Sequence, residues 1–376
     1  MKKLIILLIG IVIFIGCESN TYADIEEEKN DSFDINLKWN KAYPDDSIDK
    51  SVIGLKWALS YLGAKLPKNL IGISYSNAII SMNINQLGFN ENAVEKLSLL
   101  NIKIKESQEY KNTNTIDLGR FVSLLLGSSE HYYQISGTPN RLEELLGNYI
   151  LKPEKGYVNN SGVSLEHRII KFSEQVGFNQ VFLSQEVDPI TQEIYEFETI
   201  ELLPNGQLRF GIFDVNGRRK NNADSNHSNA GKPAKCMWCH ESSINQLFSP
   251  QLNFSGYLTA TQFQNTLINY RNLNKNLKLN LDSAIDYSQT QQHTLTELLY
   301  ISFMEPSAER VSLEWNLPLN KVQSLLSGLS THVYDEFPFL GNLYHRNEIE
   351  KRAPFPGLAV SSSVREMSNI EVNHLK

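Results

Sequence analysis

Through residues 40–150, apolar side chains recur every three or four positions, which is the spacing of one face of an α-helix. The clearest run begins after Ser47 or Asp49, either of which can cap a helix N-terminus, and ends at Gly63. Its apolar positions are Val52, Leu55, Ala58, Leu59 and Leu62. Similar spacing predicts two further helices, over residues 91–100 and 118–126.

Between residues 165 and 215 the pattern changes to strands, because Val, Ile, Phe and Tyr become frequent and apolar positions alternate with polar ones. The predicted strands cover residues 180–187, 194–203 and 207–214. Between the last two, Pro204-Asn205-Gly206 predicts a hairpin, since Asn-Gly supplies the positive φ that tight turns need. We therefore expect a small antiparallel sheet in this part of the chain.

Residues 216–235 are rich in Asn, Ser, Gly and charged side chains, and this composition predicts a loop. Helical spacing resumes beyond it. The predicted helices cover residues 242–247, 259–270, 294–303, 308–315 and 319–326. Together, these patterns predict a mainly α protein with a small antiparallel β-sheet, an α+β fold.

The N-terminus has the pattern of an export signal. Two lysines precede twelve apolar residues, 4–15, a length typical of signal peptides and too short to span a bilayer. The residues that follow, Gly16-Cys17, resemble a bacterial lipobox, in which cleavage before Cys leaves a lipid on its thiol. Lipoboxes usually have Leu where Phe14 stands. We expect residues 1–16 to be a signal peptide and Cys17 to be lipidated, with an ordinary signal peptide as the alternative.

Composition limits the classes of protein that fit. Hydrophobic residues make up 41% of the chain, which is typical of a globular protein. Residues 17–38 are polar and acidic and predict a flexible tether. The formal charge is −7, and it becomes −9 once the two lysines of residues 1–16 are removed. An acidic surface argues against nucleic acid as a partner.

Two of the three cysteines lie within Cys236-Met237-Trp238-Cys239-His240. The pattern C-x-x-C-H resembles the haem attachment site of the c-type cytochromes. The resemblance implies one covalent haem c, joined through thioethers to Cys236 and Cys239, with His240 as the proximal iron ligand. It also implies a cytochrome-c-like helical region around the motif, which lies at the start of a helix in that family. A single motif indicates a monohaem protein.

Two other kinds of site also use such cysteines. A zinc site could combine Cys236 and Cys239 with His227 or His240, although adjacent Cys and His residues fit poorly into one tetrahedron. A thiol redox pair also has the C-x-x-C spacing, but there the motif normally follows a buried strand. Here Lys232-Pro233-Ala234-Lys235 comes before it. Both alternatives stay open from the sequence.

The sixth iron ligand determines what such a haem does. Met304 is the favoured candidate because it lies 64 residues past His240, similar to the separation in small cytochromes, and Pro306 places it near a helix end. Met304 could instead be a core residue. The remaining candidates are an open site or one of four histidines: His227, His293, His332 and His345. A Met ligand favours electron transfer, whereas an open site allows small-ligand chemistry.

From these patterns we expect four segments: a signal peptide (1–16), a tether (17–38), an N-terminal α+β domain of unknown role (39–215) and a haem-binding domain (216–376). The expected function is electron transfer by a membrane-anchored lipoprotein of a bacterial cell envelope, facing the periplasm or the cell surface, with a redox protein as partner. The alternatives are an open-site haem enzyme acting on peroxide or another small oxidant, and a zinc-binding or structural lipoprotein. No catalytic residue set stands out, so an electron carrier is favoured over an enzyme.

Overall fold

The computed structural model describes residues 34–249 and 251–376, and the first predicted helix forms there as its caps indicate. Helix α1 (Ile48–Tyr61) follows Ser47, whose side-chain oxygen accepts a hydrogen bond from the Lys50 backbone N–H at 3.3 Å. Helix α2 (Glu91–Glu106) extends past the predicted end, and α4 (Leu118–Leu126) matches its prediction. The signal peptide and Cys17 lie outside the described residues.

The other helices of the described part are α3 (Gln108–Thr113), α5 (Ser129–Ser136), α6 (Leu142–Leu146), α7 (Pro233–His240), α8 (Ala260–Lys278), α9 (His293–Met304), α10 (Ala308–Trp315), α11 (Leu319–Leu325) and α12 (Arg346–Glu350), with 3₁₀ turns η1 (Ile84–Gln86), η2 (Thr290–Gln292) and η3 (Pro338–Leu340). Four of these, α8 to α11, are predicted helices. Within the described residues no helix is long and apolar enough to cross a membrane.

A four-stranded sheet, which the sequence patterns do not predict, contains β1 (Ile35–Lys38), β2 (Ile73–Ser76), β3 (Ile79–Met82) and β4 (Ile116–Asp117). Its order is β2-β3-β1-β4, with β1 antiparallel to β3 and parallel to β4. Strand β1 lies inside the segment expected to be a tether, and its Ile35 and Leu37 are fully buried. The folded body therefore begins before residue 39.

The predicted antiparallel sheet is confirmed and is larger than expected. It runs in the order β5-β6-β7-β8-β9 and consists of β5 (Leu151–Val158), β6 (His167–Ser173), β7 (Val181–Val187), β8 (Ile194–Leu202) and β9 (Leu208–Asp214). The predicted hairpin joins β8 to β9: Gly206 has φ +83°, and the Leu203 N–H donates to the Gln207 carbonyl at 2.8 Å. Strands β5 and β6 were not predicted.

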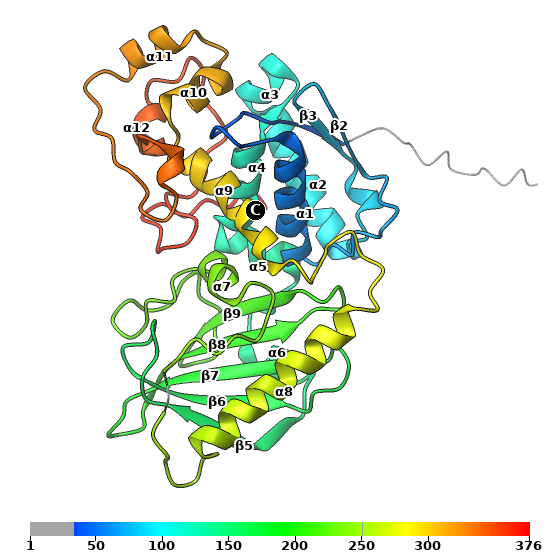
Figure 1. The fold of residues 1–376 in the computed structure, drawn as a ribbon, viewed down its shortest axis with the longest axis vertical. Coiled ribbons are helices and arrows are strands. Elements are labelled where there is room, and N and C mark those ends of the chain that lie inside the picture. The colour runs from blue at the N-terminus through cyan, green and yellow to red at the C-terminus, as the bar shows by residue number, and fades with distance from the viewer. Residues whose placement is uncertain (1–33, 250) are drawn as a thin grey trace, which may run out of the picture. The chain divides into compact units, whose positions relative to one another are not determined.

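Helices cover both faces of this sheet (Figure 1). On one face, Tyr270 of α8 packs its ring 5.5 Å from Phe172 and 5.9 Å from Phe182. Gly156 of β5 allows α8 to approach, because a Cβ there would lie 2.4 Å from the Phe263 ring. On the other face, residues of α6 share a small core with β7 and β9. The motif helix α7 lies on the α8 side and contacts β9 and α9.

The main hydrophobic core contains residues from both sides of residue 215, where a domain boundary was expected. Helix α9 packs against α1 and α4, and the Thr296 hydroxyl donates to the Gly54 carbonyl at 2.7 Å. Helices and sheets together make a mixed α/β structure. The part of the predicted α+β class that is confirmed is the combination of helices with an antiparallel sheet. None of the described elements identifies a cytochrome c fold.

Candidate functional site

The C-x-x-C-H residues lie at the end of helix α7, not at the start of a helix as expected. The helix ends at His240 because Glu241 (φ +48°) and Ser242 (φ +64°) both adopt left-handed backbone conformations. Residues 242–247, predicted to be helical, contain no helix for the same reason. The motif therefore occupies the last turn of a short helix, which turns directly into the loop that follows.

The N-terminus of α7 is fixed by a buried lysine. Pro233 occupies the first turn, where its missing N–H leaves no hydrogen bond unmade. Beside it, Lys232 is 0% exposed and donates to the Gly127 carbonyl at 2.7 Å and the Ser363 carbonyl at 3.0 Å. Its ammonium also pairs with Glu371 at 2.5 Å. These contacts hold the motif helix against α4 and the C-terminal segment.

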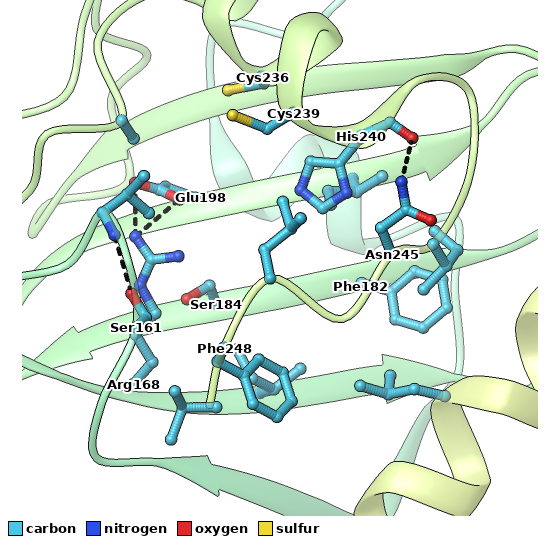
Figure 2. A pocket seen from close by; sticks show the side chains of 18 of the residues that line it. Ser161, Arg168, Phe182, Ser184, Glu198, Cys236, Cys239, His240, Asn245 and Phe248 are labelled. Atoms are coloured by element: carbon cyan, nitrogen blue, oxygen red, sulfur yellow. Dashed lines mark hydrogen bonds and ion pairs between the residues drawn. The ribbon is translucent and has the colours of Figure 1, made fainter. Parts of the chain in front are cut away.

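Both thiols and the imidazole of the motif face one cavity (Figure 2). This cavity encloses about 940 Å³ not occupied by atoms, part of it open to solvent. The part of it that the centre of a water molecule can reach is about 140 Å³. Its apolar lining comes from the sheet, α8, the β5–β6 loop and the loops on either side of α7, and consists of Val158, Val163, Ile170, Phe182, Ile200, Ala230, Ile244, Leu247, Phe248, Phe263 and Leu267.

A charged group forms one end of this cavity. Arg168 of β6 pairs with Glu186 at 2.5 Å and with Glu198 at 3.3 Å, and all three side chains point from the same face of the sheet. Burial raises the pKa of Glu186, and the nearby Arg168 opposes that shift. Arg168 and Glu198 could not be identified from the sequence, because nothing local predicts β6 or its register with β7 and β8.

The cavity changes the ionisation of the motif side chains. Burial lowers the pKa of His240 to about 4, and the neighbouring Ser243 backbone opposes the shift. The ring is therefore neutral at pH 7, and its Nδ1 is buried without a hydrogen-bond partner. Burial also raises the pKa of both Cys236 and Cys239. A neutral imidazole is the form that ligates a metal, and two protonated thiols are poor nucleophiles.

These features test the three kinds of site. A thiol redox centre needs a lowered cysteine pKa, and here the pKa of each cysteine is raised. A zinc site needs converging ligand atoms, yet the one such group of His, Cys, Asp and Glu among the described residues is elsewhere. His227 is engaged with Glu166 at 3.2 Å and stacks on Tyr195. Two thiols, a neutral imidazole and apolar walls are the features that a covalent haem needs.

The structure does not bring Met304 to the motif. Met304 is half-buried at the end of α9 and lines a different cavity, beside Tyr300 and Glu305. His293 pairs with Glu297 at 3.0 Å, and His332 and His345 lie together near Glu305. Besides His240, the described residues that line the motif cavity include no Met and no His.

No protein-family model matches this chain, and no curated protein or solved structure is significantly similar to it.

Proposed function

We propose that this protein is an exported, lipid-anchored monohaem c-type cytochrome that exchanges single electrons at a bacterial cell envelope. The observation that supports it most is that Cys236, Cys239 and His240 all face one largely apolar cavity. Export and anchoring rest on the sequence alone, through residues 1–16 and Cys17. A cytochrome-c-like arrangement of helices around the motif remains a prediction, since a sheet and α8 form most of the cavity wall.

Each side chain of the site has a role under this proposal. The bound haem would supply the one-electron chemistry. Cys236 and Cys239 would hold it covalently, and His240 would ligate its iron. Phe182 and Phe248 would exclude water from its faces, which shifts a reduction potential by lowering the local dielectric. Arg168 is positioned to offset carboxylate charge at the polar end of the cavity.

An open-site haem protein is the second candidate, and a separate observation favours it. Besides His240, the described residues around the cavity offer neither a thioether nor an imidazole, the usual sixth ligands of electron carriers. A haem held here would then be able to bind peroxide or another small oxidant at its iron. Besides the motif residues, the polar side chains that line that cavity are Ser161, Arg168, Ser184, Glu198, Lys235 and Asn245.

Both candidate functions require a covalently attached haem, so retention of haem tests them together. The chain, made in a bacterium with a c-type maturation system, should keep haem through acid and denaturant. The double variant Cys236→Ala/Cys239→Ala should not. Met237→Leu is the matched control, because Met237 lies between the two cysteines, is buried, and carries no expected haem contact. Wild-type protein that retains no haem, made alongside a successfully matured cytochrome, would contradict the proposal.

Carbon monoxide separates the two candidates. An electron carrier with a saturated iron should not change its ferrous spectrum when carbon monoxide is added. An open site should bind carbon monoxide at once and shift the main haem band. Binding of carbon monoxide would support the open-site haem protein over the electron carrier, and it would not contradict covalent haem attachment.

A further inference from the structure

Three potential metal ligands meet at a place separate from the motif cavity, which none of them lines. Glu305, His332 and His345 each offer one ligand atom, and these atoms all lie within 4.8 Å of one another. Glu305 is the C-terminal cap of α9, His332 lies in the segment after α11, and His345 caps α12. We propose that these three side chains bind a divalent transition-metal ion such as Zn²⁺.

The backbone holds the three segments together without a metal. His332 and Leu343 exchange two hydrogen bonds, of 3.1 Å and 2.9 Å, as an isolated antiparallel bridge. One residue further on, the Tyr344 N–H donates to the Pro306 carbonyl at 3.0 Å, next to Glu305. His345 then caps α12, and its carbonyl accepts hydrogen bonds from the N–H groups of Glu348 at 3.0 Å and Ile349 at 3.3 Å. Residues far apart in the chain are thus fixed side by side before any ion binds.

The side chains are close to ligand geometry. His332 Nε2 lies 3.0 Å from Glu305 Oε2, and the rings of His332 and His345 stack with their centroids 4.5 Å apart and 17° between their planes. Around tetrahedral zinc, with bonds of roughly 2.1 Å, neighbouring ligand atoms lie about 3.4 Å apart. Because the three ligand atoms already lie within 4.8 Å of one another, ligation requires any pair of them to close by at most about 1.4 Å. His345 is exposed, so its ring has room to move.

The ligand set leaves coordination positions free. Two imidazoles and one carboxylate make the protein ligands of catalytic zinc sites, which keep a further position for water or substrate. Glu305 and His345 also line the cavity that contains Met304, which encloses about 1960 Å³, part of it open to solvent. A bound ion would face this space. The site is accordingly of the kind that binds a water or a small anion as its remaining ligand.

Titration calorimetry with ZnCl₂ tests the proposal on the purified full chain carrying Cys236→Ala and Cys239→Ala, which removes the competing thiols. One Zn²⁺ should bind. His332→Ala, His345→Ala and Glu305→Gln should each weaken binding by roughly tenfold or more, as loss of a ligand requires. His227→Ala is the matched control, since His227 also pairs with a carboxylate, Glu166, and stacks on a ring but belongs to no three-ligand group.

Cobalt gives an independent readout. Co²⁺ bound to the same protein should show visible d–d bands that disappear in His332→Ala. Zn²⁺ should also raise the melting temperature of the parent protein but not of that variant. The proposal is overturned if Zn²⁺ does not bind, or if it binds equally well to the His332 and His345 variants. Because His345 is exposed, its variant stays informative even if His332→Ala unfolds.

Discussion

Replacing His131 with Gln should make the folded protein less sensitive to acid. The His131 ring is fully buried, and its Nδ1 lies 2.7 Å from the Leu124 carbonyl. Its Nε2 accepts a hydrogen bond from the His374 backbone N–H at 2.8 Å. Because Nε2 must accept, the ring is neutral with its proton on Nδ1. Protonation would place an N–H opposite another N–H and release the C-terminal segment at His374.

The loss of stability at low pH follows from the shifted pKa of His131. Burial lowers the pKa of His131 from 6.5 to about 4, and the hydrogen bond to Leu124 opposes this shift. The unfolded chain therefore binds a proton more readily than the folded one, so stability is lost as pH falls from 6.5 towards 4. By linkage the loss is about 2 kcal/mol at pH 5 and approaches roughly 3 kcal/mol below pH 4.

Urea unfolding at pH 7 and pH 5 measures this loss. His131→Gln can still accept from His374 through its amide oxygen but cannot be protonated. We expect the variant to be less stable at pH 7 and to lose about 2 kcal/mol less than wild type between the two pH values. His240, whose pKa is also lowered to about 4, is present in both proteins and cancels. Equal losses of stability in the two proteins would show that His131 does not cause the acid sensitivity.

Three further outcomes are expected. Glu314 pairs with Arg310 at 2.6 Å and Arg346 at 2.7 Å, and these cations are among the groups that lower its pKa to about 2. Glu314→Gln should therefore lower the free energy of unfolding, measured in urea at pH 7, by roughly 3–5 kcal/mol. The difference from wild type should shrink as pH falls below about 4.5, because Glu314 becomes protonated in the unfolded chain. Met304→Ala should lower stability by about 2 kcal/mol and leave a haem spectrum unchanged, whereas loss of a near-infrared Met–iron band would make Met304 a ligand after all. Cys17→Ser should release the protein from membranes, and a mature chain starting at an unacylated Cys17 in intact-mass measurement would exclude lipidation.

Elements determined by local signals were predictable from the sequence. Ser47 caps α1, and the hairpin at Gly206 forms where Asn-Gly indicated it. The four-stranded sheet was missed because its strands have only two to four residues, too few for an alternating pattern to emerge. The prediction of a helix over 242–247 is wrong because Glu241 and Ser242 adopt left-handed backbone conformations. Residue propensities do not predict such conformations for residues other than Gly, Asn or Asp.

In the candidate site too, some residues could be predicted from the sequence and others could not. Cys236, Cys239 and His240 could be identified because their chemistry depends on spacing within five residues. The walls could not, because Arg168 and Phe182 reach the cavity only through the register of β6, β7 and β8. The pairing of His332 with His345 depends likewise on a two-residue bridge. Tertiary contacts, not sequence spacing, decide what lies opposite the motif.

The cavity also bears on when a haem would be attached. Cys236 and Cys239 face inward towards sheet and α8, and burial keeps both as thiols. In the folded chain they are poorly placed to react with an incoming macrocycle, so under the proposed function attachment precedes closure of α7 over the sheet. An attached haem would give the apolar lining of the cavity the close contacts of a packed core. The same walls that hinder late attachment would therefore make an attached haem part of the hydrophobic core.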